Sequence, residues 1–175
     1  MFKILALLFS TWVLYQVFSH WPRENPQLIF CDVGQGDAIL VQHKFMQLLV
    51  DTGKKSGEVL KCLRENMPLF DKNIGFLLLT HMDSDHIGGA PLVLDGFSVS
   101  FLVTNPSAKE SADFNLLQQS VLSKRHQGMR VLSGFAGLRL ALSSLVEFTL
   151  LSPQEAVARQ MWAKHDFSEA TLADK

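Results

Sequence analysis

Four side chains that can bind a metal ion lie within six positions of the sequence: His81, Asp83, Asp85 and His86. They directly follow residues 74–80, an apolar run that predicts a buried strand. Neutral imidazoles and carboxylates are ligands that Zn²⁺ and Mn²⁺ accept in proteins. Without a cation, the carboxylates of this short segment would repel each other in a partly dry site. The segment therefore predicts a metal site in the turn between a strand and a helix.

A simpler explanation of this segment is helix capping, because Asp is a favourable N-cap residue. Capping needs one Asp and leaves both histidines without a role, so we favour the metal site. Elsewhere, His43 and His126 lie in polar stretches, and we expect both to be exposed. His165 could be a later ligand, but no apolar strand lies beside it to hold its imidazole.

Two Asp residues upstream lie in turns at strand ends. Asp37 closes a turn that contains Gly34 and Gly36, and glycine permits the positive φ angles that such turns use. Asp51 and Gly53 form the turn after the next strand. We expect each Asp either to stabilise its turn or to orient a ligand histidine.

The rest of the pattern predicts an α/β fold. Strands are expected at residues 27–33, 38–42, 45–50, 74–80, 99–104 and 129–132, then as a pair at 138–142 and 146–151. Helices are expected at residues 56–66, 87–94, 114–125 and 153–162. Gly88 should let the second of these helices approach other backbone closely. This order of strands, followed by strand–helix alternation, is typical of a sheet packed against helices.

The amino terminus differs from the rest of the chain. Residues 4–22 contain no Asp, Glu, Lys or Arg, which fits an uncleaved membrane anchor or a secretory signal peptide. We favour an anchor, because no clear cleavage site follows and Trp21 suits the membrane interface. Lys3 then places the amino terminus inside and the domain outside the cytoplasm. A secreted protein is the second possibility and a soluble cytoplasmic protein the third. We divide the chain into residues 1–26 and a domain at 27–175.

Composition and charge narrow the class of protein. Hydrophobic residues make up 47% and charged residues 19% of the 175 positions, as in one folded domain with a hydrophobic segment. The formal net charge of −1 shows no basic footprint of a tight nucleic-acid binder. Cys31 and Cys62 lie in strand and helix patterns, where free Cys behaves as a small hydrophobe. No spacing motif indicates a disulfide between them, and the possibility stays open.

The metal-binding segment, with Gly88 following it, resembles the His-x-His-x-Asp-His signature of metallo-β-lactamase-fold hydrolases. Residues 30–40 and 48–53 resemble the opening strands of one branch of that fold, the hydrolase domain of ComEC-type DNA-uptake proteins. Asp83 in place of the second His is typical of this branch. The resemblance is strong over about residues 28–90 and continues in outline to Leu151. It implies an αββα sandwich.

The resemblance also implies chemistry. Two cations, Zn²⁺ or Mn²⁺, would bind here, one to His81 and Asp83 and the other to Asp85 and His86. Asp83 favours harder ions than an imidazole would, so Mn²⁺ competes with Zn²⁺. A pair of cations about 3.5–4 Å apart can share a hydroxide and direct it at phosphorus or a carbonyl carbon. Asp85 is the ligand that we expect to be catalytic.

In the family, the second half of the sandwich supplies another Asp and two more His, and the chain shows no such motifs after Leu151. We therefore interpret it as an amino-terminal fragment, inactive by itself; the alternative is a complete but degenerate protein. The implied function is a phosphodiesterase or DNase that acts outside the cytoplasm on single- or double-stranded DNA. Alternatives are a non-catalytic binding module of a competence or envelope assembly, and a hydrolase of another ester or amide.

Overall fold

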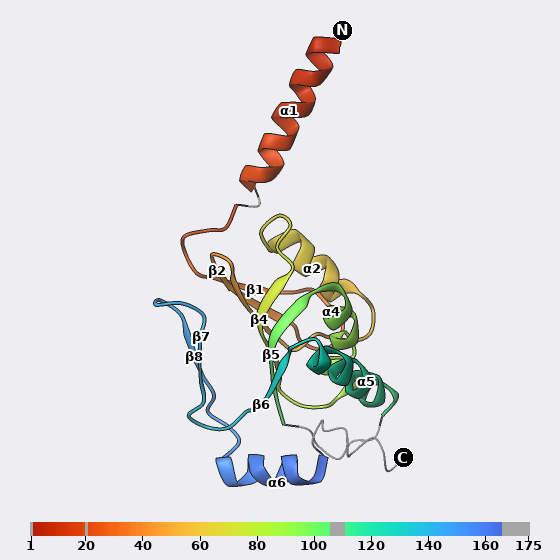
Figure 1. Cartoon of the computed structure of the whole chain (residues 1–175), viewed down its shortest axis with the longest axis vertical. Helices are drawn as coiled ribbons and strands as arrows, with labels where there is room; N and C mark the ends of the chain where they lie inside the picture. The colour runs from red at the N-terminus through yellow and green to blue at the C-terminus, as the bar shows by residue number, and fades with distance from the viewer. Residues whose placement is uncertain (1, 20, 106–110, 166–175) are drawn as a thin grey trace.

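The computed structural model describes residues 2–19, 21–105 and 111–165, with side chains up to residue 163 (Figure 1). Its helices are α1 (Phe2–Ser19), α2 (Glu58–Asn66), α3 (Ser84–Ile87), α4 (Ala90–Gly96), α5 (Ala112–His126) and α6 (Glu155–His165). Its strands are β1 (Gln27–Phe30), β2 (Ile39–His43), β3 (Met46–Val50), β4 (Asn73–Leu79), β5 (Ser98–Thr104), β6 (Arg130–Ser133), β7 (Arg139–Ala141) and β8 (Glu147–Thr149). Every strand predicted from the sequence is present.

Strands β1 to β6 form one sheet in chain order, and β7 pairs with β8 in a separate hairpin. The first three strands are antiparallel, as expected for strands joined by short turns. From β3 to β6 the strands are parallel, and helices connect them. The carboxyl ends of these four parallel strands therefore lie at one edge of the sheet, which we call the carboxyl edge.

The two faces of the sheet belong to two separate cores. One face packs under α2, α4 and α5 through residues such as Leu40, Leu49 and Leu77. The other face contributes Val41, Leu48 and Val103 and lies against the β7–β8 hairpin through Leu140 and Leu142. Figure 1 shows those helices on one side of the sheet and the hairpin on the other. This is the helix-covered half of the expected αββα sandwich with part of its second sheet.

One predicted helix, at residues 87–94, is in fact two helices. Gly88 and Gly89 separate α3 from α4, and Pro91 occupies the first turn of α4. Proline has no backbone amide to donate to the carbonyl four residues earlier, so the α3 hydrogen-bond ladder cannot continue through it. The close approach expected of Gly88 is confirmed, since a Cβ there would lie 2.7 Å from the Lys55 amide nitrogen.

Helix α1 extends away from the domain (Figure 1). None of its residues is buried, and its mean hydropathy is 1.5. By length and composition α1 could cross a membrane. A signal sequence near the amino terminus has the same length and composition, so these features fit both an anchor and a signal sequence.

Cys31 and Cys62 form a disulfide that ties the segment after β1 to α2, with their Cα atoms 5.7 Å apart. The pairing answers the question that the sequence left open. The two cysteines are 31 residues apart in the sequence and meet only when α2 packs on the sheet, so the sequence alone could not predict that they pair.

Loss of this disulfide should destabilise the fold. A cross-link that closes a loop of 31 residues restricts the unfolded chain, and its removal costs about 3–4 kcal/mol of unfolding free energy in the chain-entropy description. We expect the Cys31→Ser/Cys62→Ser double variant to show this loss in urea denaturation monitored by circular dichroism. Addition of a reductant should lower the stability of the wild type to that of the variant and leave the variant unchanged. Equal stability of the oxidised wild type and the variant would contradict the expectation.

His43 was predicted to be exposed, and that prediction is wrong: its side chain is 4% exposed. Its Nε2 lies 2.9 Å from the Glu24 carbonyl oxygen and its Nδ1 lies 2.7 Å from Ser143 Oγ. The carbonyl can only accept, so Nε2 carries the proton and Nδ1 accepts from the Ser143 hydroxyl. His43 thereby joins the linker after α1 to the turn of the β7–β8 hairpin, two segments far from it in the sequence.

Replacement of His43 by Ala should therefore destabilise the protein by about 1–3 kcal/mol, because two buried hydrogen bonds are lost. His126, at the exposed end of α5, provides the matched control. His126→Ala should lower the unfolding free energy by less than His43→Ala does, because the side chain of His126 is exposed whereas that of His43 is buried. Thermal unfolding of both variants gives the comparison, and an equal effect of the two would show that the His43 contacts contribute nothing.

Candidate metal centre

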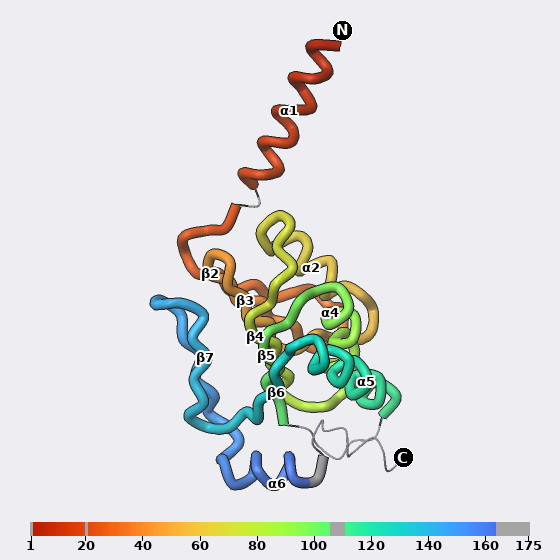
Figure 2. The backbone as a smooth tube through the Cα atoms, viewed as in Figure 1, coloured from red at the N-terminus to blue at the C-terminus, as the bar shows by residue number. Residues whose placement is uncertain are grey.

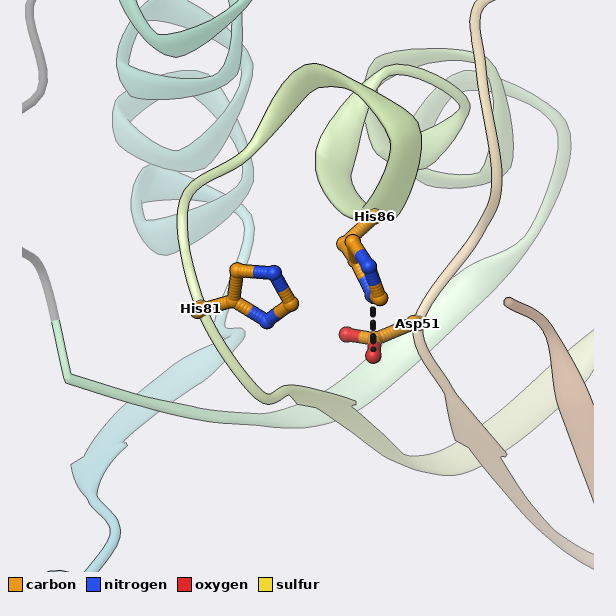
Figure 3. Close-up of side chains that lie close together, drawn as sticks. All are labelled: Asp51, His81 and His86. Carbon is orange, nitrogen blue, oxygen red and sulfur yellow. Dashed lines mark hydrogen bonds and ion pairs between the residues drawn. The ribbon is translucent and has the colours of Figure 1, made fainter. Parts of the chain in front are cut away.

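Three potential ligands meet at the carboxyl edge of the sheet. Asp51 follows β3, His81 follows β4, and His86 lies on α3 directly beyond. One ligand atom from each lies within 4.8 Å of the others. Figure 3 shows the two imidazoles and the carboxylate turned toward one another. They meet because β3 and β4 are parallel neighbours, and the Asp51 amide donates to the Leu78 carbonyl at 2.8 Å to extend that pairing.

The Asp51 carboxylate is 3% exposed, and both of its oxygens form hydrogen bonds. Its Oδ1 accepts from the Thr80 amide at 2.8 Å, and its Oδ2 accepts from the Thr80 hydroxyl at 2.6 Å. Oδ2 also lies 2.9 Å from His86 Nδ1. The Asp51 backbone has a φ of 54°, a left-handed conformation that Asp tolerates better than most residues. These bonds fix the carboxylate and, through it, the orientation of the His86 ring.

The same hydrogen bonds assign the protons of both imidazoles. A carboxylate only accepts, so His86 Nδ1 carries a proton and donates it to Asp51. The Thr80 hydroxyl gives its proton to Asp51, so its oxygen accepts from His81 Nδ1, 2.9 Å away. In the neutral form, each histidine then has an unprotonated Nε2. A metal-binding histidine commonly has this arrangement, with one nitrogen held by a carboxylate or hydroxyl and the other free.

The two remaining carboxylates lie beside these free nitrogens. Asp83 Oδ2 lies 3.9 Å from His81 Nε2, and Asp85 Oδ1 lies 4.0 Å from His86 Nε2. Two ligands bound to one cation at about 2.0–2.2 Å with a tetrahedral angle stand roughly 3.3–3.6 Å apart. Each imidazole–carboxylate pair is thus close to the spacing that one shared cation requires. The two imidazole rings lie 3.8 Å apart between centroids, so the two pairs adjoin.

The turns that follow β1 and β3 pack against the backbone of Asp85 and His86. The Gly53 amide donates to the Asp37 carbonyl at 2.9 Å, and the Thr52 amide donates to the His86 carbonyl at 2.8 Å. Gly36 has a φ of 89°, and a Cβ at that position would lie 1.6 Å from the carbonyl oxygen of Asp85. Only a residue without a side chain can therefore pass so close to the Asp85 backbone.

Gly36→Ala should displace the Asp85 segment, and Gly34→Ala is its matched control. Both glycines have positive φ, so Ala is strained at either position, but nothing lies within 4 Å of a Cβ at Gly34. The additional overlap at Gly36 should cost about 1–3 kcal/mol beyond the loss at Gly34. Urea denaturation of the two variants measures the difference. Equal stabilities of the Gly36→Ala and Gly34→Ala variants would mean that the turn at Gly36 does not pack against the Asp85 backbone.

The structure brings all four residues of the predicted segment into one cluster, and Asp51 joins them. Asp37 is exposed and reaches this region through its backbone carbonyl. Asp83 occupies the N-cap position of α3 without a side-chain capping bond, so capping does not account for it. The side chain of His165 lies outside the described residues. Thr80 was missed by the sequence analysis, although its place between the strand and His81 was visible there.

The chain belongs to the metallo-beta-lactamase superfamily, whose members are generally hydrolytic metalloenzymes: the superfamily's sequence profile matches residues 31–136, more than half of the chain. A particular relative is ComE operon protein 3 of Bacillus subtilis (strain 168), which is 30% identical over 141 residues. The match covers 70% of this chain and 18% of that protein, so the chain spans less than a fifth of its relative's length.

Two solved structures resemble this chain. The chemotaxis sensor ODP, solved as a peroxy diiron species, aligns with 71% of this chain and 48% of its own, at 16% identity and a TM-score of 0.50. The Rm3 metallo-beta-lactamase aligns with 76% of this chain and 53% of its own, at 16% identity and a TM-score of 0.49. At 16% identity, the likeness to ODP shows the fold alone.

Proposed function

We propose that this chain carries half of a two-cation centre of a hydrolase that cleaves phosphodiester bonds of DNA outside the cytoplasm. The observation that carries the proposal is the pairing of each free imidazole nitrogen with a carboxylate, at 3.9 Å for His81 and Asp83 and at 4.0 Å for His86 and Asp85. The donor set fits Zn²⁺ or Mn²⁺, since it combines imidazole nitrogen with carboxylate oxygen.

Each residue of the cluster has a distinct role in this proposal. His81 and Asp83 hold one cation, and Asp85 and His86 hold the second, so Asp85 takes part in catalysis as a ligand. Asp51 and Thr80 orient the two imidazoles from behind. Bound cations would supply a hydroxide and neutralise the charge that develops during attack. Two donors per cation leave further coordination positions for other ligands to fill.

DNA as the substrate rests on resemblance. The segments at residues 30–40 and 48–53 resemble the ComEC-type DNA-uptake branch, and the match to ComE operon protein 3 supports this branch. A net charge of −1 implies weak, salt-sensitive binding of DNA by the chain alone. Weak binding would be compatible with a hydrolase that another module or partner supplies with DNA.

Two features support a place outside the cytoplasm. Helix α1 has the length and hydropathy of a membrane anchor, with the domain of residues 27–175 attached by a short linker. The chain contains a disulfide between Cys31 and Cys62. Disulfides form and persist in oxidising compartments and are rare in the cytosol. We therefore propose a membrane-anchored protein whose domain lies outside the cytoplasm.

The substrate is tested with the full-length gene product, a linear DNA and a chromogenic β-lactam, assayed side by side with added Mn²⁺ or Zn²⁺. We expect cleavage of DNA that a chelator abolishes and that added metal restores, because the hydroxide depends on the cations. Turnover of the β-lactam without cleavage of DNA would overturn the substrate while leaving the fold unaffected.

A further inference from the structure

The sheet edge opposite the metal centre presents large apolar side chains to solvent. They lie in the linker after α1, the β2–β3 turn, the α2–β4 loop and the β7–β8 turn. We call this set the loop-tip patch; its members and exposed fractions are Trp21 (63%), Phe45 (58%), Met46 (40%), Leu69 (38%), Phe70 (90%) and Leu145 (72%). Large apolar side chains gathered on one exposed region commonly mark a contact with a partner or a membrane.

Hydrogen bonds through His43 hold three of these segments together. The buried ring bonds the Glu24 carbonyl of the linker and the Ser143 hydroxyl of the β7–β8 turn, while His43 itself ends β2. Lys44, in the β2–β3 turn, also forms an ion pair with Glu24 at 2.9 Å. Figure 2 shows the linker and the β7–β8 turn at the end of the domain nearer α1.

The α2–β4 loop lies at the same edge. Gln47, at the start of β3, donates to the Asp71 carboxylate at 3.2 Å, which places this loop beside the β2–β3 turn. Trp21 lines a small cavity together with Gln42 of β2 and Asn66 at the end of α2. All four segments of the patch therefore converge where α1 joins the domain.

Phe70 is the most exposed member and has an unusual backbone. Its φ is 67°, a left-handed conformation that is costly for a bulky aromatic residue. The residue is 90% exposed, so packing within the chain does not repay that cost. An aromatic side chain held outward in a strained turn is typical of a contact made with something outside the chain.

We propose that the loop-tip patch rests on the lipid bilayer beside α1. The inference deepens the proposed membrane anchoring and rests on it, because α1 ends at Ser19 and Trp21 follows two residues later. Aromatic side chains favour the membrane interface, where their rings lie at the level of the headgroups. Arg23 and Lys72 are exposed in the same linker and loop and can reach lipid phosphates. The patch and the anchor thus form one continuous membrane-facing surface.

This contact would fix the direction in which the metal centre opens. Strand β4 runs from the patch edge at Asn73 to the metal edge after Leu79, and its seven residues span about 23 Å at roughly 3.3 Å per residue. The centre would then lie at the end of the domain away from the bilayer, separated from the patch by up to about that length of strand. Its substrate would arrive from the aqueous phase rather than along the membrane surface.

The test measures tryptophan quenching in vesicles of phosphatidylcholine and phosphatidylglycerol with brominated or ordinary acyl chains. The background is the full chain with Trp12→Phe and Trp21→Phe, which keeps Trp162 as an internal reference. Phe70→Trp and Leu145→Trp report on the patch. Leu151→Trp is the matched control, because Leu151 is 86% exposed and lies beyond the opposite end of the hairpin. A separate chain that keeps Trp12 reports on insertion of α1.

We expect brominated lipid to quench the reporters at positions 70 and 145 several-fold more than the reporter at position 151. Quenching of Trp12 without quenching at positions 70 and 145 would overturn the patch contact and leave the anchor standing. If Trp12 is not quenched either, both the anchor and the contact are wrong. Circular dichroism of each variant confirms that the exposed substitutions leave the fold unchanged.

Discussion

In the proposed DNA hydrolase, replacement of Asp85 by Asn should lower the rate of DNA cleavage by about 10³-fold or more. The substitution removes the negative charge of one ligand while keeping its shape, so the substituted side chain and His86 would hold a cation only weakly, and the hydroxide that the cation would supply would be lost. A loss of several kcal/mol of transition-state stabilisation corresponds to such a factor, since each 1.36 kcal/mol is about tenfold in rate. The rate is measured with a linear DNA substrate at saturating Mn²⁺.

Asp95 offers the matched control for this variant, because it is an exposed Asp on α4 outside the metal centre. Asp95→Asn makes the same chemical change and should leave the rate unaltered. If Asp85→Asn also retained the wild-type rate, Asp85 would have no part in catalysis, whatever the cluster binds.

The second large effect concerns the cations themselves. The chain should bind Zn²⁺ or Mn²⁺ weakly, because each pair offers two donors to a cation that prefers four or more. The double variant His81→Ala/Asp85→Asn removes one donor from each pair and should abolish this binding in titration calorimetry. The control is His126→Ala/Asp95→Asn, which changes the same residue types at exposed positions. The same affinity in both double variants would refute the assignment of these ligands.

The sequence predicted the parts of the site that are local. Asp83 and Asp85 lie within a few positions of His81, so they share one turn wherever the strand before them leads. Orienting a ligand histidine was one of the two roles expected of Asp51, and its Oδ2 lies 2.9 Å from His86 Nδ1. The pairing of ligands that the resemblance implied stays a proposal, as does cation binding; the paired atoms lie 3.9 and 4.0 Å apart.

What the sequence could not predict depends on contacts between distant segments. His43 looked exposed because the residues that bury it belong to the linker and to a hairpin that comes 100 positions later. The Cys31–Cys62 pair is formed only when α2 packs against the sheet. The role of Thr80 was hidden for a different reason, since its hydroxyl becomes significant only when the proton of each hydrogen bond is assigned.

The most direct test of the two-cation centre is anomalous diffraction from crystals of the protein soaked in Mn²⁺ or Zn²⁺. We expect two peaks about 3.5–4 Å apart. One should lie about 2.0–2.3 Å from His81 Nε2, next to Asp83, and the other at the same distance from His86 Nε2, next to Asp85. No peak at the carboxyl edge, or a peak bound to the Nδ1 atom of either histidine, would contradict the account.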